Sequence, residues 1–139
     1  MTTVKDQTVF TEYILKVFQK RFDGSVNFYR SWQEYRNGFG NVHGEYWLEI
    51  NNEFDSRFDF LTGDSLGTYH KGHEFKTKDK YGKDKCPILY IGAWWYNSCH
   101  YSNLNGKYGD NNYGKGLDWH SWKGYYESLK RTEMKIRRE

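Results

Sequence analysis

The sequence lacks the features that mark several large classes of protein. It contains one proline and two cysteines in 139 residues, and no apolar run is long enough to cross a bilayer. Residues 1–7 lack the apolar stretch of a secretory signal peptide, so the sequence itself does not direct the protein outward. Repeats and low-complexity linkers are also missing. We therefore expect one domain spanning residues 1–139, with no insertion into a membrane.

An excess of charge of one sign is missing as well. The chain has 21 basic and 18 acidic residues, which gives a formal net charge of +3. The basic residues are scattered, apart from residues 76–85 and the C-terminal tail. No basic stripe of the kind that follows a phosphate backbone is present. We therefore expect no nucleic-acid partner.

Aromatic residues supply most of the apolar content. Phe, Trp and Tyr make up 20% of the chain, hydrophobic residues of all kinds only 37%, and the mean hydropathy is −1.02. Tyrosine and tryptophan bury a large ring, but each also carries a polar group that needs a partner. This composition favours a loop-rich α+β fold over an α/β fold filled with Leu and Val. It also suits sugar binding, although aromatic residues belong to a core more often than to a site.

Local patterns predict short elements. Ser31 followed three residues later by Glu34 has the pattern of a capping box, and it predicts a helix that ends near Gly38. The Asp23-Gly24 pair predicts a turn between two strands. The remaining expectations are strands at 12–20, 25–29, 57–61 and 125–136, a second short helix at 45–49, a buried segment at 91–96, and loops at 62–85 and 103–116.

The two cysteines, Cys86 and Cys99, have two interpretations. They are free buried thiols or a disulfide, and their spacing alone does not decide between these. If they pair, the short loop that they close adds roughly 3 kcal/mol to the free energy of unfolding. Pairing would also require an oxidising compartment.

Four stretches of the chain are recognisable in order. They read FQKRFDGSVNFYRSW at 18–32, GFG and GEYWL at 38–40 and 44–48, GAWWYNSCH and NLNG at 92–100 and 103–106, and WHSWKGYY and LKRTEMKI at 119–126 and 129–136. With these stretches the chain resembles the fibrinogen-like C-terminal domain family from about residue 17 to residue 137. The family includes ficolins, tachylectins, angiopoietin-type ligands and the ends of tenascins.

The resemblance implies a secreted, extracellular α+β domain. It would have a small antiparallel sheet, short helices and a loop-rich C-terminal subdomain that binds ligand. It also implies that Cys86 and Cys99 form a disulfide. Two departures indicate a truncated version of the domain. The central strands that follow residue 48 in the family are largely missing here, as is the N-terminal segment with its own cysteine pair. A sheet that loses strands exposes edges and loses core.

The lectin members of the family hold an acetyl group in a pocket beside the disulfide. The resemblance implies that aromatic walls enclose the methyl group here, and that a cis peptide between Ser98 and Cys99 turns backbone N–H groups into the pocket. Gly114 stands where the family often has a small alanine, so we expect a slightly enlarged floor. The implied ligand-binding residues are Tyr90, Ser98, Cys99, His100, Tyr113, Gly114 and Tyr125. The alternative is that the tyrosines are only core.

A calcium loop is a second site that the resemblance implies. The family places several acidic residues before the first cysteine of the bridge, and here Asp79 and Asp84 are the candidates, while Tyr81 replaces one acidic position. Ca²⁺ needs several oxygen ligands. The lysines interleaved in this loop oppose a divalent cation by charge repulsion.

The sequence predicts a recognition domain and no enzyme. No paired-carboxylate arrangement or phosphate loop stands out, and a cysteine in a disulfide cannot act as a nucleophile. The leading hypothesis is a lectin-like module of innate immunity that binds acetylated glycans such as N-acetylglucosamine. Its expected partner is an acetylated glycan or a cell-surface glycoprotein. The alternatives are a protein-binding module for a receptor or integrin, and a truncated fragment without function. A homo-oligomer would depend on regions outside this chain.

Overall fold

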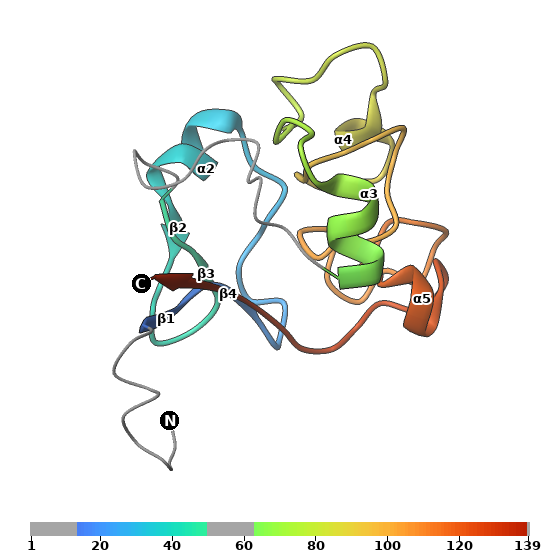
Figure 1. Cartoon of the computed structure of the whole chain (residues 1–139). Helices are drawn as coiled ribbons and strands as arrows, with labels where there is room; N and C mark the ends of the chain where they lie inside the picture. Colours follow the sequence, from blue (N-terminus) through green and yellow to red (C-terminus); the bar gives the residue numbers. More distant parts are fainter. Residues whose placement is uncertain (1–13, 50–62, 139) are drawn as a thin grey trace.

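The computed structural model describes residues 14–49 and 63–138. Within these residues, four antiparallel strands form one sheet in the order β2-β3-β1-β4. The strands are β1 (Ile14–Arg21), β2 (Phe39–Gly40), β3 (Tyr46–Trp47) and β4 (Thr132–Arg138). The sheet and helix α2 lie on one side of the molecule, while the other helices and most of the loops lie on the other side (Figure 1).

The first and last described strands form the longest pairing of the sheet. Strand β1 pairs with β4 from Ile14 opposite Arg138 to Arg21 opposite Thr132, with one irregularity in the register. The expected first strand is confirmed. The expected last strand begins later than residue 125, because hydrogen bonds to loop residues hold the chain before it. The Gly114 N–H donates to the Tyr125 carbonyl, and the Leu129 N–H donates to the Leu117 carbonyl.

Two local predictions near the sheet are wrong, each for its own reason. Residues 25–29 form no strand, since the Glu45 carboxylate satisfies the backbone of the preceding turn instead of a partner strand. The N–H groups that it accepts belong to Phe22, Asp23, Gly24 and Val26. The expected helix at 45–49 is replaced by β3, which pairs with both β1 and β2. That pairing buries Trp47 in the core.

Helix α2 (Trp32–Asn37) confirms the capping-box prediction. The Ser31 side chain accepts from the Glu34 N–H, and the Glu34 side chain accepts from the Ser31 N–H, so both ends of the motif are closed. Gly38 ends the helix with a φ of 85°, a conformation that favours glycine. The helix buries Tyr35, whose hydroxyl donates to the Phe28 carbonyl at 2.6 Å.

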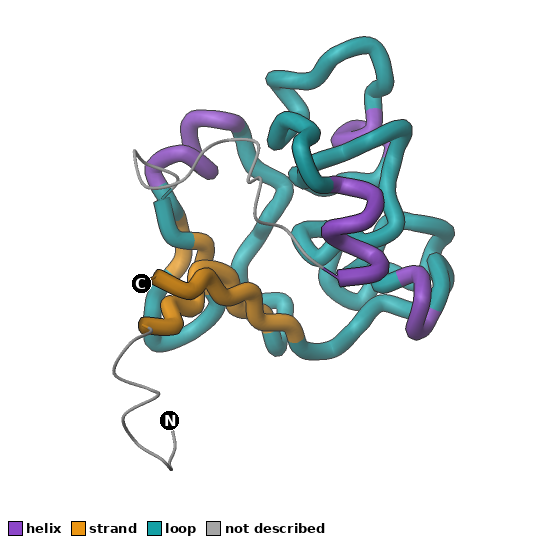
Figure 2. Tube along the Cα trace, viewed as in Figure 1, coloured by secondary structure: helices purple, strands orange, loops and turns teal. Residues whose placement is uncertain are grey.

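The rest of the described chain is mostly loop (Figure 2). The segment 62–85, expected to be loop throughout, contains a π-helical turn, η1 (Gly63–Gly67), and the single turn α3 (Thr68–His70). Two further short helices follow, α4 (Cys86–Leu89) and α5 (His120–Lys123). None of the helices within the described residues is long and apolar enough to cross a membrane. The expected strand at 57–61 lies outside these residues.

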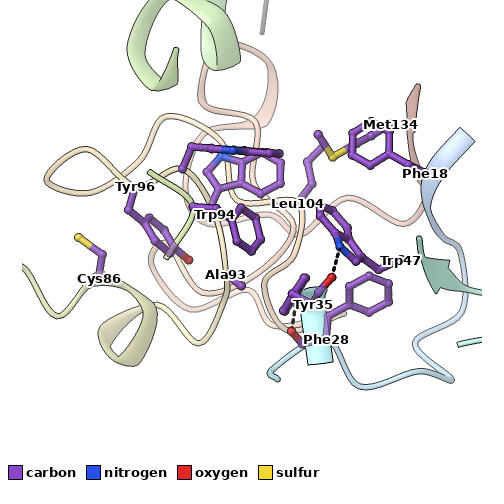
Figure 3. Close-up of a cluster of buried hydrophobic side chains, with 12 residues drawn as sticks. Phe18, Phe28, Tyr35, Trp47, Cys86, Ala93, Trp94, Tyr96, Leu104 and Met134 are labelled. Carbon is purple, nitrogen blue, oxygen red and sulfur yellow. Dashed lines mark hydrogen bonds between the residues drawn. The ribbon is translucent and has the colours of Figure 1, made fainter. Parts of the chain in front are cut away.

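The core is aromatic, as the composition predicts. Trp47 packs on Tyr35 and Phe75 at ring distances of 5.1 and 5.5 Å, and its indole N–H donates to the Tyr35 carbonyl (Figure 3). Trp94 and Trp95 continue this packing from the expected buried segment, and their exposed fractions are zero. This cluster joins the sheet to the loop-rich part.

Polar side chains make a second junction between the two parts. From β1, the Gln19 amide donates to the Leu104 carbonyl and to Asn105, and Arg21 donates to the carbonyls of Leu104 and Gly106. All of these groups are buried. The loop at 103–116, confirmed as irregular, therefore begins inside the molecule, and its first residues are fixed against the sheet.

Candidate functional site

The disulfide predicted from the resemblance is present. Cys86 opens helix α4 and bonds to Cys99, with an Sγ–Sγ distance of 2.04 Å and a Cα–Cα distance of 5.5 Å. The peptide between Ser98 and Cys99 is cis, which was also expected. The bridge holds the first residue of α4 beside residues 98–100. These residues form one wall of a cavity.

The cavity has a volume of about 190 Å³. Six of the seven predicted ligand-binding residues line it, and Tyr69 and Tyr101 complete the lining. The full set is Tyr69, Tyr90, Ser98, Cys99, His100, Tyr101, Tyr113 and Tyr125. The residues that the resemblance implied as ligand-binding therefore lie together in the structure. Their binding role remains a prediction.

Gly114 lies behind the cavity wall. It is buried with a φ of +70°, and a Cβ added there would come within 2.8 Å of two ring carbons of Tyr90 and 3.3 Å from His100 Cε1. The space that an alanine would take is therefore occupied by the Tyr90 ring. The glycine positions a wall of the cavity, and the expectation that it simply widens the floor does not match this packing.

The tyrosine walls are arranged around His100. The Tyr90 ring meets the imidazole edge-on at 4.9 Å, and the Tyr125 ring lies 5.6 Å from it. The Tyr125 hydroxyl donates to the His100 carbonyl at 2.8 Å, while burial raises the pKa of this phenol to about 12. Tyr113 contacts Tyr125 at 5.0 Å and is 49% exposed, so the cavity is open to solvent on that side.

His100 and Asp118 form a buried pair without hydrogen bonds. His100 Nε2 lies 3.8 Å from Asp118 Oδ2, and neither nitrogen of the imidazole nor either oxygen of the carboxyl group has a hydrogen-bond partner within the described residues. Burial lowers the pKa of His100 to about 4 and raises that of Asp118 to about 7. Burial thus favours the neutral form of both groups, which leaves unused polar capacity at the cavity.

The backbone at the cavity also has spare donors. No acceptor among residues 14–49 and 63–138 takes the N–H of Cys99 or of His100. The next N–H, that of Tyr101, donates to His70 Nε2 at 3.1 Å. Two consecutive amides beside the disulfide therefore have no hydrogen-bond partner within the described residues.

His70 is a structural residue within the segment 62–85, which was expected to be loop. It is fully buried, and its Nδ1 lies 2.7 Å from the Trp95 carbonyl. Because Nε2 accepts from Tyr101, Nδ1 must carry the hydrogen and donate. Burial lowers the pKa of His70 to about 4. The His70 imidazole, at the C-terminal end of α3, therefore holds the backbone of Tyr101 in place.

Three residues of the site were not predicted. Tyr101 follows His100 directly, so its position in the chain was a usable signal. Tyr69 and Asp118 had no such signal, since they come from α3 and from the segment before α5.

Asp79 and Asp84 have other partners. Asp79 accepts from the Trp32 N–H and from the Thr77 hydroxyl, and Asp84 accepts from the Ser98 hydroxyl. The described residues contain no group of three or more His, Cys, Asp or Glu side chains that could hold a metal. This donor set does not fit a Ca²⁺ ion, which needs several oxygens directed at one point.

A larger cavity of about 470 Å³ lies elsewhere, between the turn at 24–29 and residues 106–108. Its inner wall includes Arg21, whose guanidinium lies 4.1 Å from the centre of the Phe28 ring and donates to two backbone carbonyls. These contacts serve the junction between sheet and loops. The candidate site is therefore the smaller cavity beside the disulfide.

Comparisons with known proteins agree with this fold. The family model described as "Fibrinogen beta and gamma chains, C-terminal globular domain" matches residues 12–56 and 52–139. Microfibril-associated glycoprotein 4 of Bos taurus is 39% identical over 176 residues, which cover 88% of this chain and 68% of the relative. Tenascin-R of Gallus gallus is 35% identical over 87% of this chain, but over only 12% of its own length.

Solved structures give the same result. The fibrinogen-like globe domain of human ANGPTL2 has a TM-score of 0.74 and 30% identity, covering 89% of this chain and 79% of that domain. Lamprey fibrin D-dimer, in complex with the peptide Gly-His-Arg-Pro-amide, has a TM-score of 0.66 and 27% identity, covering 87% of this chain and 60% of that one. The chain therefore belongs to the family of fibrinogen C-terminal globular domains.

Proposed function

We propose that this chain is an extracellular recognition domain that binds acetylated glycans, such as N-acetylglucosamine, in the cavity beside the Cys86–Cys99 disulfide. The observation that carries the proposal is the composition of that cavity. Aromatic rings form its walls, and two consecutive backbone amides at its disulfide edge have no acceptor within the described residues.

The chemistry of an acetamide group matches this arrangement. Its methyl group needs an apolar enclosure, which the rings of Tyr90, Tyr113 and Tyr125 supply. Its carbonyl oxygen needs donors, and the N–H groups of Cys99 and His100 supply them. At about 190 Å³ the cavity is smaller than the several hundred cubic ångströms typical of sites for drug-sized ligands. It therefore suits one small substituent of a sugar, with the rest of the sugar outside.

Binding to immobilised N-acetylglucosamine tests the proposal. We expect the protein to be retained and to elute with free N-acetylglucosamine but not with glucosamine, which lacks the acetyl group. Tyr113→Ala removes an exposed wall and should abolish retention. The matched control is Tyr81→Ala, an exposed tyrosine in the lysine-rich loop away from the cavity lining, which should leave retention intact. Retention that glucosamine reverses equally well would refute the proposal.

A peptide ligand is the second candidate, because the fibrin D-dimer that shares this fold was solved with a four-residue peptide. An assay with the protein immobilised separates the two functions. A short basic peptide that is retained by the protein, and is not displaced by N-acetylglucosamine, would favour protein recognition.

The extracellular location rests on the disulfide and on the relatives. A disulfide between the only two cysteines of the sequence fits an oxidising compartment. One relative is named as a glycoprotein associated with microfibrils. Mass mapping of the natural protein without reduction would show Cys86 and Cys99 linked, and two free thiols would contradict this location.

A further inference from the structure

Strand β4 leaves one side of the sheet open. It is the last strand in the order β2-β3-β1-β4, and within the described residues it pairs with β1 alone. The opposite edge belongs to β2, which is only two residues long, whereas β4 has seven. An edge strand presents a row of unpaired N–H and C=O groups, and proteins keep such edges short or cover them. The outer edge of β4 is therefore where another strand can pair with this sheet.

The comparisons indicate that an internal part of the domain is missing from this chain. The match to microfibril-associated glycoprotein 4 extends over 176 residues, although this chain has only 139, so part of the relative's domain has no counterpart here. The family model also matches in two pieces, which meet at residues 52–56. The resemblance implied that this part holds strands, and a sheet that loses strands exposes an edge.

The side chains of β4 separate into an apolar and a charged face. Met134 is buried and Ile136 packs against the core, while Glu133 and Lys135 are exposed. The Glu133 carboxylate lies 3.5 Å from the Lys135 ammonium. Arg137 adds a second positive charge two positions later. Along this face the strand therefore begins with an acid and continues with cations.

This order of charges is complementary to itself in an antiparallel pairing. Two copies of β4 that are centred on Lys135 pair over all seven residues and place Glu133 of each copy opposite Arg137 of the other. Symmetry makes this attractive contact twice, whereas Lys135 meets its own copy only once and keeps the Glu133 of its own chain. Opposite charges that face each other across two strands stabilise the pairing, and like charges destabilise it. Parallel strands in register would align like charges throughout.

An apolar groove lies beside the beginning of the same strand. Its volume is about 370 Å³, and Leu104, Trp119, Trp122 and Leu129 line it together with residues 131–133. Trp122 is 68% exposed. Exposed apolar surface gathered in one place often marks a contact with another protein. In the antiparallel pairing, the end of each β4 passes the beginning of the other, where this groove opens, so apolar contact adds to the backbone hydrogen bonds.

We propose that this chain forms a symmetric dimer in which the β4 strands of two copies pair antiparallel and join the two sheets into one. The dimer is closed, because the described edge that remains on each copy is the two-residue strand β2. The proposal is independent of sugar binding, since no residue of β4 lines the cavity beside the disulfide. It also needs no region outside this chain, unlike the homo-oligomer that the sequence led us to expect. Two copies would carry two cavities, which raises the apparent affinity for a surface with many ligands.

Sedimentation equilibrium of the whole chain tests the dimer directly. One strand pair with a small groove makes a small interface, so we expect a dissociation constant of about 10 µM. The protein should then be mostly monomeric at about 1 µM and mostly dimeric at about 100 µM, without larger species. A wild-type chain that stays monomeric at about 100 µM overturns the proposal, whatever the variants do.

Two charge variants test the pairing. Glu133→Lys makes both partners of the cross-strand contact positive, and Arg137→Glu makes both negative. Each variant alone should dimerise about tenfold more weakly or worse, because two like-charged contacts replace two attractive ones. Mixed in equal amounts, the variants restore opposite charges at both contacts, so a heterodimer should form about as tightly as the wild-type dimer. Arg137→Glu that dimerises as well as the wild type overturns the pairing centred on Lys135.

Glu127→Lys is the matched control, since it makes the same change in net charge as Glu133→Lys. Glu127 is exposed, lies outside β4 and pairs with Lys123 at 4.0 Å. This variant should dimerise like the wild type. An equal loss in Glu127→Lys and Glu133→Lys would show that net charge, and not the strand edge, controls association, which overturns the proposal.

Hydrogen exchange of the wild-type protein supplies a readout that needs no variant. The amides of β4 that do not bond to β1 should exchange more slowly when the protein is concentrated enough to dimerise, because they then donate to the partner strand. The amides of helix α2 should exchange at the same rate at both concentrations. Unchanged rates in β4 of a protein that does dimerise would place the interface elsewhere and overturn the proposal.

Discussion

Two neighbouring stretches of the loop-rich part treat their polar groups in opposite ways. At 103–106, the buried side chains of Asn103 and Asn105 are hydrogen-bonded to backbone carbonyls and to other side chains. At 98–100 and Asp118, buried nitrogen and oxygen atoms and two amides have no hydrogen-bond partner within the described residues. Polar groups that are hydrogen-bonded, here called saturated, hold a loop in one conformation. Polar groups without a partner, here called unsaturated, keep their capacity to bind a ligand.

The difference explains how a domain with little sheet can carry a defined cavity. The saturated loop fixes the backbone of residues 90, 114 and 116 through a single amide, that of Asn103. These cavity walls are then positioned from outside, so the side chains of His100 and Asp118 need not serve the fold through hydrogen bonds. Changes in the saturated stretch are therefore expected to affect stability more than changes in the unsaturated one.

The largest effect is expected for Asn103→Ala. This change removes the acceptor of the Tyr96 hydroxyl and the donor to the carbonyls of Gly114 and Gly116, and it leaves these groups buried without partners. We expect the free energy of unfolding to fall by about 3 kcal/mol in urea titration. In the control, Asn112→Ala, the side-chain amide is exposed and donates to the nearby Asp110, so the loss should stay below about 0.5 kcal/mol. Equal losses would contradict the comparison.

The pH dependence of stability is expected to reveal the unsaturated pair. His70 and His100 have folded pKa values near 4, below the ordinary value of 6.5, so the unfolded state binds more protons there and stability falls as the pH drops from 6.5 to 5. Asp118, with its pKa raised to about 7, acts in the opposite direction, since its folded state binds the extra proton. The two histidines outweigh the one carboxyl group, so the free energy of unfolding falls by roughly 1 kcal/mol for each unit by which the pH drops.

Asp118→Asn sharpens this prediction. Removing the opposing group should make the loss of stability between pH 6.5 and pH 5 about twice as steep, because both histidines then act without compensation. Urea titrations at several pH values measure the slope. An unchanged slope in this variant would mean that Asp118 does not hold an extra proton in the folded state.

A smaller effect is expected for Gly114→Ala compared with Gly109→Ala. Both glycines have φ near +70 to +77°, so each alanine costs about 1 kcal/mol in backbone strain. Only the alanine at 114 meets a neighbour, the Tyr90 ring at 2.8 Å, while nothing lies within 4 Å at 109. We expect a larger loss of stability in urea for Gly114→Ala than for Gly109→Ala, and weaker N-acetylglucosamine binding only for Gly114→Ala. Equal binding by the two variants would show that the Tyr90 wall is not needed.

The smallest effect is expected for calcium. Because the described carboxylates near Asp79 and Asp84 serve hydrogen bonds and do not converge, adding a chelator should change neither the melting temperature nor sugar retention. Differential scanning calorimetry with and without Ca²⁺ measures this. A rise of several degrees with Ca²⁺ would restore the calcium loop that the resemblance implies.

Predictions from the sequence were right where the forces are local. The helix at Ser31 was foreseen because its capping box acts within four residues. The loop at 25–29 was not foreseen, since a carboxylate about twenty positions away accepts from the backbone of the preceding turn. Strand β3, in place of the helix expected at 45–49, was not foreseen either, since its pairing with β1 and β2 decides it. At the site, the resemblance supplied residues such as Tyr90 and Tyr113, whereas Tyr69 and Asp118 had no pattern around them that indicated a cavity.

By itself, the sequence determined an aromatic core, the capped helix and, through the resemblance, the bridge between Cys86 and Cys99. These depend on residue type and on neighbours close in the chain. The tertiary structure alone decided which polar groups are satisfied: His70 is saturated and His100 is not, although both are buried histidines. The physical reason is that hydrogen bonds require a partner within about 3 Å, and only folding sets that distance.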